Sequence, residues 1–257
     1  MANKKPYILI TNDDGIDALG IKTLIEIVSD IGEIVVIAPV KAESGKSHAI
    51  TINKPIRLNL IEDKKNLKIF TATGTPVDCV KLALNQVLKK KPDYLFSGIN
   101  HGSNSSVSAI YSGTIGAAVE GCLNGIPSAG FSLMSHKPDA DFSAAKFYTE
   151  KIIKYLLENK PDDYTCLNVN IPYIKKEEIQ GIKICTMTQG VWKEEYEKRI
   201  DPHNRPYYWL TGYFKNNEPD NELSDEWALN NNYVSVVPLQ TDWTAYHQID
   251  NLKDMEK

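Results

Sequence analysis

The chain begins with a strand-like run that ends abruptly in acidic residues. Residues 7–10, Tyr-Ile-Leu-Ile, are apolar and partly β-branched, which is typical of a strand buried on both faces of a sheet. The sequence Asn-Asp-Asp-Gly follows at residues 12–15, and a helical pattern of apolar positions begins near Leu19. Such a strand, turn and helix form the unit of an open α/β sheet, in which ligands bind at the carboxyl ends of the strands.

Two neighbouring carboxylates, Asp13 and Asp14, are expected at the tip of this first strand. Adjacent anions repel each other and are costly to desolvate unless a cation joins them, so the pair favours a bound divalent metal. The alternative is that one of them only caps the following helix. A cap needs a single carboxylate, and the pair therefore indicates a metal site.

Strand and helix patterns alternate as far as about residue 180. Further strands are expected at residues 33–39, 92–96, 126–131 and 166–171, and further helices at 75–88, 112–123 and 142–157. Extended segments are also expected at 50–60 and 67–71, separated by a charged turn at 62–66. The order predicts an α/β fold, Rossmann-like and doubly wound, with a mainly parallel sheet.

The last third of the chain has a different pattern. Residues 181–188 and 233–239 are strand-like, and the segment 205–214 between them is dense in aromatic residues. This segment predicts a β-hairpin with exposed rings, to which Trp192, Tyr196 and Trp243 add. The rings either pack on their own domain or form a subunit interface, where Tyr and Trp are enriched.

These patterns divide the chain into a Rossmann-like α/β core, residues 1–180, and a C-terminal extension, residues 181–257, with the aromatic hairpin and a tail.

Composition narrows the class of protein. The 257 residues carry a net charge of −4, which gives no basic surface for duplex nucleic acid. The cysteines are far apart in the sequence and are expected to be reduced, buried thiols. Residues 1–6 are short and polar and do not resemble a signal peptide, and there is no apolar run of membrane-spanning length. We expect a soluble, cytoplasmic protein.

Polar loops that follow the parallel strands should meet at one edge of the sheet. Their sequences are Asn-Asp-Asp at 12–14, Ser-Gly-Lys-Ser-His at 44–48, Ser-Gly-Ile-Asn-His-Gly-Ser-Asn at 97–104 and Ser-Gly-Thr at 112–114. Oxygen ligands of this kind suit Mg²⁺ or Mn²⁺, with Ca²⁺ as a third candidate, whereas zinc favours Cys and clustered His. The helix that begins at Ser112 offers free backbone N–H groups to a phosphate.

Familiar nucleotide and hydrolase motifs are missing. Gly45-Lys46-Ser47 resembles the end of a P-loop, but Val40 stands where the first glycine is required. The turn after the first strand has no G-x-G-x-x-G, and the chain has no G-x-S-x-G. Dinucleotide binding and serine hydrolysis are therefore disfavoured.

Several longer motifs in register resemble the SurE family of survival proteins, which are 5′-nucleotidases. They are Thr-Asn-Asp-Asp-Gly-Ile, Ala-Pro-x-x-x-x-Ser-Gly-x-Ser-His-x-Ile-Thr, Thr-Gly-Thr-Pro-x-Asp-Cys-Val, Ser-Gly-Ile-Asn-x-Gly-x-Asn and Tyr-Ser-Gly-Thr-x-x-Ala-Ala-x-Glu-Gly. The resemblance is dense over residues 7–131 and looser to about residue 240. It implies a Rossmann-like, metal-dependent phosphatase of nucleoside monophosphates that forms dimers or tetramers through a C-terminal hairpin and exchanged terminal segments.

The resemblance also implies a set of site residues. The metal ligands fall on Asp13, Asp14, Ser44 and Asn100. We expect Asp13 to orient or deprotonate a water and Asp14 to be the plainer ligand, although the two roles are interchangeable at this stage. Residues expected to bind the phosphate are Gly45, Ser47, Asn104, Ser112, Gly113 and Thr114.

Structural roles compete with these functional ones. Ser44 and Ser47 would satisfy a turn, Asn100 would close its loop in a left-handed conformation, and Ser112 or Thr114 would cap a helix. His48 is expected to be a structural donor and Lys46 a solvated charge, because a lone histidine is weak evidence of catalysis.

Other functions use similar residues. A broader phosphatase acting on 3′-nucleotides or short polyphosphate would need the same site chemistry. A nucleotide-binding regulatory module without turnover would explain the loops but not the paired aspartates. A haloacid-dehalogenase-like phosphatase would need Asp-x-Asp after the first strand, and Asp13 and Asp14 are adjacent.

Overall fold

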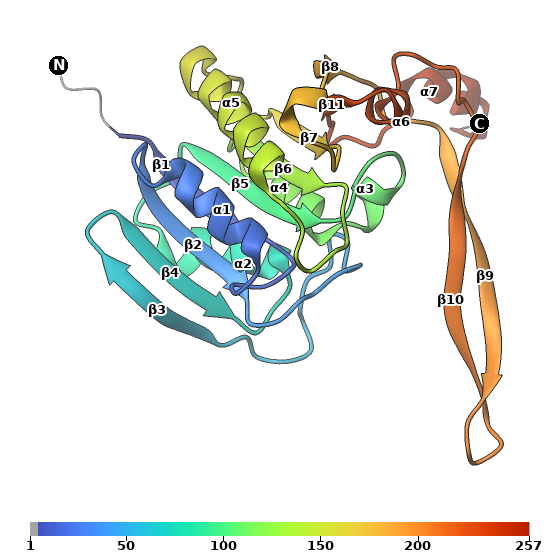
Figure 1. Ribbon diagram of the computed structural model, residues 1–257, viewed down its shortest axis with the longest axis horizontal. Coiled ribbons are helices and arrows are strands. Elements are labelled where there is room, and N and C mark those ends of the chain that lie inside the picture. Colours follow the sequence, from blue (N-terminus) through green and yellow to red (C-terminus); the bar gives the residue numbers. More distant parts are fainter. Residues whose placement is uncertain (1–4, 257) are drawn as a thin grey trace.

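The computed structural model describes residues 5–256, without the side chains of residues 194 and 195. Residues 1–4 lie outside this range. They belong to the segment 1–6, which is not expected to be a signal peptide. A nine-stranded sheet has the order β3-β4-β2-β1-β5-β6-β7-β11-β8, and β9 and β10 form a separate two-stranded sheet that projects from it (Figure 1). The strands are β1 Tyr7–Thr11, β2 Glu33–Pro39, β3 Leu58–Lys64, β4 Leu67–Ala72, β5 Tyr94–His101, β6 Ser128–Leu133, β7 Cys166–Ile171, β8 Gly181–Ile184, β9 Gly190–Ile200, β10 Pro206–Asn216 and β11 Tyr233–Pro238.

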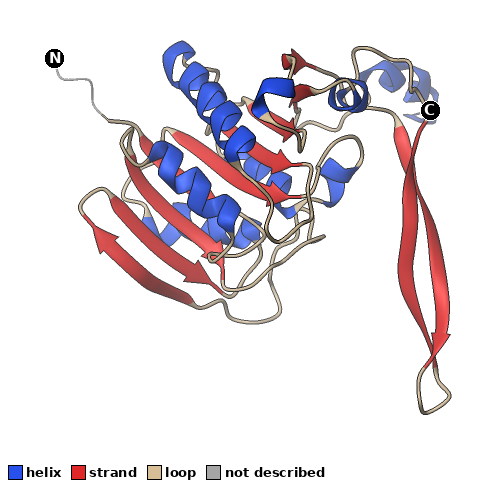
Figure 2. Cartoon of the chain, in the orientation of Figure 1, coloured by secondary structure: helices blue, strands red, loops and turns tan. Residues whose placement is uncertain are grey.

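Helices cover both faces of the main sheet (Figure 2). The α-helices are α1 Leu19–Val28, α2 Pro76–Leu82, α3 Ser108–Tyr111, α4 Gly113–Leu123, α5 Ser143–Asn159, α6 Asp225–Asn230 and α7 Tyr246–Leu252. The helices α1 and α5 pack on one face, and α2 and α4 pack on the other. The helix α2 continues as a π-helix, Ala83–Val87. The α/β fold with a mainly parallel sheet, predicted from the alternating patterns, is confirmed.

The central strand β1 explains why the sheet is covered on both sides. It is buried along its whole length and pairs in parallel with β2 and β5. Alternate side chains point to opposite faces, so Ile8 and Ile10 join the core under α1 and α5, while Leu9 joins the core under α2 and α4. An apolar run of this kind places the residues that follow it at the middle of the sheet edge.

Some boundaries differ from the sequence-based expectation. The charged residues 62–64, expected in a turn, continue the strand β3, because they lie at a sheet edge where alternate side chains reach water. Residues 50–57 form no regular strand, and the strand expected at 181–188 ends at Ile184. The cysteines are buried and free, as expected.

The predicted hairpin is confirmed, although it is longer than the aromatic segment alone. The strands β9 and β10 pair antiparallel from Gly190↔Asn216 to Ile200↔Pro206. Rings such as those of Trp209 and Tyr213 do not pack on their own domain, because they are 58% and 60% exposed. Part of residues 181–257 thus completes the main sheet and part forms the hairpin, and the division at residue 180 stays a prediction. Within residues 5–256, every helix is too short or too polar to cross a membrane.

Candidate active site

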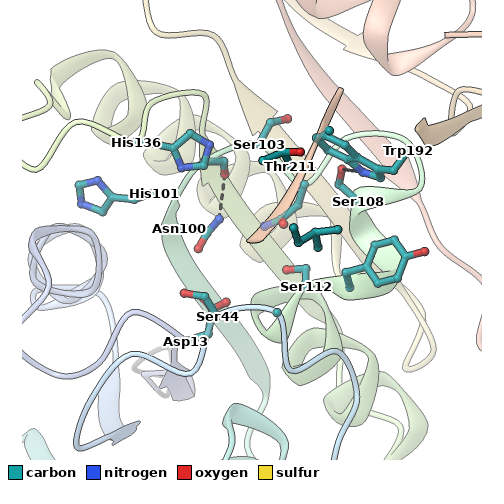
Figure 3. Close-up of a pocket in the computed structure, with 16 residues that line it drawn as sticks. Asp13, Ser44, Asn100, His101, Ser103, Ser108, Ser112, His136, Trp192 and Thr211 are labelled. Carbon is teal, nitrogen blue, oxygen red and sulfur yellow. Dashed lines mark hydrogen bonds between the residues drawn. The ribbon is translucent and has the colours of Figure 1, made fainter. Parts of the chain in front are cut away.

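A pocket of about 670 Å³ lies at the carboxyl ends of the parallel strands (Figure 3). Its floor comes from the loops after β1, β2 and β5 and from the start of α4, as the sequence predicts. The expected site residues that line it are Asp13, Ser44, Gly45, Asn100, Asn104 and Ser112.

Asp13 is a buried carboxyl group at the end of β1, and it accepts a hydrogen bond from the hydroxyl of Thr114 on α4. Burial raises the pKa of Asp13 to about 6; the neighbouring Asp14 adds to the rise and the Thr114 hydroxyl opposes it. Gly113 permits this approach, because a Cβ there would lie 2.9 Å from the Cβ of Asp13. The site therefore holds a carboxyl group that is costly to ionise in the absence of a cation.

Asp14 points to a different neighbour. Its Oδ2 accepts a hydrogen bond of 3.0 Å from the backbone N–H of His101 at the end of β5. Burial raises its pKa, and the His101 hydrogen bond opposes this. The N-cap position of α1 is Ala18, and no side chain caps that helix. The alternative that one aspartate only caps the helix is therefore wrong.

The loop with Ser44 and Gly45 is held against α3 and α4. Ser47 donates from its backbone N–H to the carbonyl of Tyr111 at 3.0 Å and from its hydroxyl to the carbonyl of Ile110 at 2.6 Å. His48 Nε2 lies 3.1 Å from the carboxylate of Glu120, as expected of a structural donor. These contacts fix the loop and leave Ser44 on the pocket wall.

The end of β5 supplies the amide group of Asn100. Its Nδ2 donates to the carbonyl of Gly102 at 2.8 Å, and Figure 3 shows its amide oxygen turned toward Asp13. Asn100 belongs to the strand and has no left-handed backbone, so the loop-closing alternative is wrong. Asp13, Asp14, Ser44 and Asn100 therefore bring carboxylate, hydroxyl and amide oxygens to one edge of the sheet.

Asn104 is fixed by buried side chains on neighbouring strands. Its backbone N–H donates to Asn170 Oδ1 at 2.7 Å, and its Nδ2 donates to Ser132 Oγ at 2.8 Å. Asn168 Nδ2 donates to its carbonyl at 2.8 Å. The sequence gives no sign of this support, because β6 and β7 contribute these partners from a distance along the chain.

The start of α4 combines a cap with an open position on the pocket. Ser112 Oγ accepts from the N–H of Ile115 at 3.1 Å, so Ser112 caps the helix and also lines the pocket. Thr114 is buried and binds Asp13 instead of facing the cavity. Of the expected phosphate ligands, Gly45, Asn104 and Ser112 line the pocket, while Ser47, Gly113 and Thr114 support its walls.

The far wall comes from residues that the sequence does not assign to the site. Trp192 of β9 donates from Nε1 to Ser108 Oγ at 3.3 Å and packs edge-on against Phe214, with ring centroids 6.0 Å apart. The other residues that line the pocket are His101, Gly102, Ser103, Ser108, Tyr111, His136, Leu210, Thr211 and Gly212. The aromatic residues of the segment 205–214 and Trp192 were the signal in the sequence that could have pointed to this wall. The sequence does not show, however, that the hairpin lies beside the edge of the sheet.

The donor set limits what ion the site can hold. Among residues 5–256, no group of three or more His, Cys, Asp or Glu side chains is arranged to bind a metal. A cation here would take its other ligands from the Ser44 hydroxyl, the Asn100 amide oxygen and water. Such all-oxygen ligation fits a hard dication such as Mg²⁺ or Mn²⁺ better than zinc.

Comparisons with known proteins agree with this geometry. The family model described as "Survival protein SurE" matches residues 8–194. A protein named 5′-nucleotidase SurE from Flavobacterium psychrophilum is 49% identical over 253 residues, 98% of each chain. A protein of the same name from Bacteroides fragilis is 47% identical and covers 100% of both chains. A crystal structure of the SurE protein from Aquifex aeolicus superposes with a TM-score of 0.84 at 37% identity, covering 98% of this chain and 100% of that chain.

Proposed function

Because this chain belongs to the survival protein SurE family, we propose that it is a 5′-nucleotidase, a metal-dependent phosphatase that releases phosphate from nucleoside 5′-monophosphates. The relatives are named 5′-nucleotidases, and the similarity extends over 98% or more of the chain. The pocket is large enough for a nucleotide, since small-molecule sites commonly occupy about 300–1,000 Å³.

The observation that carries the proposal is the pair of largely buried, adjacent carboxyl groups at the tip of β1. Burial raises the pKa of both Asp13 and Asp14, so the two are unfavourable neighbours as anions. A dication held by Asp13, Asp14, Ser44 and Asn100 would offset that cost. When bound, Mg²⁺ or Mn²⁺ would supply charge that stabilises the phosphoryl oxygens and acidifies a water.

The phosphate is proposed to lie between these ligands and the start of α4. Gly45 and Ser112 offer backbone or side-chain donors there, and α4 points the positive end of its dipole at the pocket. Asn104 borders the same space and is held still by Asn170 and Ser132. A fixed set of donors suits phosphoryl transfer, which depends mostly on positioning and charge stabilisation.

Asp13 is proposed to accept the proton of the attacking water. Its carboxyl group lines the pocket, and as an ionised ligand of the cation it can accept a proton from a neighbouring water. Thr114 keeps one oxygen occupied, which leaves the other available to the water or the cation. Asp14 is fixed by the His101 N–H and is the plainer ligand.

The exposed hairpin supports a further part of the proposal, a homodimer or homotetramer. Large apolar side chains of the hairpin are between 58% and 62% exposed in the single chain; they are Tyr196, Ile200, Trp209 and Leu210. Exposed apolar surface of this extent is typical of a protein interface. The tail α7 has no buried residue and is the second candidate contact.

Substitution of Asp14 tests the function. Asp14→Asn should lower the rate of phosphate release from a panel of nucleoside monophosphates by at least about 100-fold, because one charged ligand is lost. The matched control is Asp17→Asn, which changes an exposed aspartate three residues away. EDTA should abolish activity and Mn²⁺ restore it. Near-normal activity of Asp14→Asn, or indifference to EDTA, would refute the metal-dependent mechanism.

The same panel separates the competing functions. Equal rates with 3′-nucleotides or short polyphosphate would favour a broader phosphatase. Nucleotide binding without phosphate release would favour a regulatory module. A trapped phosphoenzyme would favour an aspartyl-phosphate mechanism of the haloacid-dehalogenase type.

A further inference from the structure

A chain of hydroxyl groups leads from the pocket wall to a carboxylate on another element. Ser103 lines the pocket, and its Oγ lies 2.7 Å from the Oγ of the buried Ser105. Ser105 in turn donates its hydroxyl to Oε1 of Glu226 on α6. Residues more than 100 positions apart in the sequence are thereby connected through a single serine.

The direction of these hydrogen bonds follows from counting protons. An ionised carboxylate can only accept, so the single proton of Ser105 is committed to Glu226. The bond between the two serines must then use the proton of Ser103. The other acceptor near that proton, Asn170 Oδ1 at 3.3 Å, also lies away from the cavity.

Ser103, which lines the pocket, is therefore left with acceptor capacity alone for any further partner. Its oxygen has two lone pairs, and one accepts from the backbone N–H of Ser105 at 3.2 Å. The remaining lone pair suits a ligand O–H or N–H. It does not suit a phosphate oxygen, which is itself an acceptor.

The position of Ser103 agrees with this. In Figure 3, Ser103 lies beside Thr211 and toward Trp192, well away from Asp13 and Ser44 at the opposite end of the pocket. With the phosphate at the Asp13 end, Ser103 would face the nucleoside.

We propose that Ser103 is a specificity-determining residue that accepts a hydrogen bond from an O–H or N–H group of the nucleoside, and that Glu226 is a positioning residue that sets this polarity through Ser105. The inference rests on the proposed function. The inference adds to that function a residue that recognises the nucleoside. The direction of the Ser103 hydrogen bond then decides which nucleosides bind well.

The direct test is Ser103→Ala with AMP and with analogues that each lack one donor. These are the 2′-deoxy and 3′-deoxy nucleotides and the purine nucleotide without the 6-amino group. Ser103→Ala should lower kcat/KM for AMP roughly five- to tenfold, the effect of losing one neutral hydrogen bond. It should leave kcat/KM unchanged for the one analogue that lacks the partner group, and inhibition by inorganic phosphate should not change.

Glu226→Ala tests the positioning role, at about pH 8 because burial raises the pKa of Glu226. The alanine side chain offers no acceptor, which releases the Ser105 proton toward Ser103 and reverses the chain of hydrogen bonds. The variant should show the same selective loss with AMP and the same normal inhibition by phosphate. Glu222→Ala, which changes an exposed carboxylate, is the matched control and should behave as the parent protein.

Binding measurements separate this inference from the proposed function. Calorimetry with adenosine, its deoxy analogues and inorganic phosphate repeats the comparison without turnover. If the parent protein releases no phosphate from any nucleotide, the proposed function fails. A five- to tenfold selective loss of adenosine affinity in Ser103→Ala would still support the acceptor role. Equal losses for all ligands, or no loss in either assay, would overturn it.

Discussion

At the scale of single residues, Asp13 is the most constrained side chain of the site. It is buried, its pKa is raised to about 6, and one oxygen is held by Thr114. Adjacent polar residues after a buried strand are a local pattern, so Asp13 and Asp14 could be predicted from the sequence. The partner Thr114 lies about 100 residues later, and its bond to Asp13 depends on how α4 packs against the sheet.

Removal of the Thr114 hydroxyl should impair the site without changing its shape. Thr114→Val removes the donor to Asp13 and leaves a buried carboxyl oxygen unpaired. We expect kcat/KM to fall roughly 10- to 100-fold, as for the loss of a hydrogen bond to a charged group. Thr114→Ser keeps the hydroxyl and should retain most activity. Equal activity of the two variants would contradict the role of this bond.

The raised pKa of Asp13 predicts a pH-dependent stability of the metal-free protein. Because the folded-state pKa lies near 6, above the ordinary value of 3.8, this group stabilises the fold below about pH 4, and that contribution is lost as the pH rises through 6. Asn at position 13 does not titrate. From about pH 4 to 7.5, Asp13→Asn should gain roughly 2 kcal/mol in free energy of unfolding relative to the parent protein.

Urea unfolding in the presence of a chelator measures this difference. Asp17→Asn, on the exposed turn, is the control and should show no such trend. A free-energy difference between Asp13→Asn and the parent that stays constant over this pH range would contradict the raised pKa of the buried Asp13.

At the scale of elements, α4 connects the separate loops of the site. Its first residue allows close contact with Asp13, and Glu120 near its end holds both His48 and Lys81, at 3.1 and 2.8 Å. Burial acts to raise the pKa of Glu120, but the hydrogen bonds from His48 and Lys81 outweigh it and leave that pKa below the ordinary value. The loop with Ser44 is therefore fixed by a carboxylate from a distant helix.

Neutralising Glu120 should loosen this loop. Glu120→Gln keeps the size of the side chain but weakens its bonds to His48 and Lys81, and we expect a loss of about 1–3 kcal/mol in the free energy of unfolding together with weaker Mn²⁺ binding. The control is Glu26→Gln, which breaks an exposed pair with Lys146 and should have little effect. Equal losses in the two variants, measured by urea unfolding, would argue against a clamp on the loop.

The elements show where sequence reasoning succeeds. Strands such as β1 and β2 are largely apolar runs with clear limits, and the helix start at Thr75 has a capping box with Asp78 that the sequence displays directly. The wall formed by Trp192 and Thr211 could not be placed in the same way. Its position depends on how the hairpin leaves the sheet, which is set by tertiary contacts.

At the scale of the whole molecule, the hairpin is the feature that a single chain does not explain. It projects away from the sheet, and aromatic side chains along it remain exposed (Figure 1). Its base also borders the pocket through Trp192. Self-association through the hairpin would cover these side chains and would hold the far wall of the site in place.

Substitution of the hairpin rings should weaken self-association. Trp209→Ser with Leu210→Ser removes two exposed apolar side chains from the strand, and sedimentation should show dissociation at concentrations where the parent protein remains associated. Tyr155→Ser, on the exposed side of α5, is a control of similar exposure. A parent protein that is already monomeric, or an unchanged mass in the variant, would contradict the proposed interface.

The central claim is that Asp13 and Asp14 share a divalent cation, and titration of the chelator-treated protein with Mn²⁺, followed by its electron paramagnetic resonance signal, tests it most directly. We expect the parent protein to bind Mn²⁺ at one saturable site per chain. Binding should be at least about tenfold weaker in Asp13→Asn and in Asp14→Asn, and unchanged in Asp17→Asn. Mn²⁺ binding of equal strength in all of these proteins, or none in the parent, would contradict it.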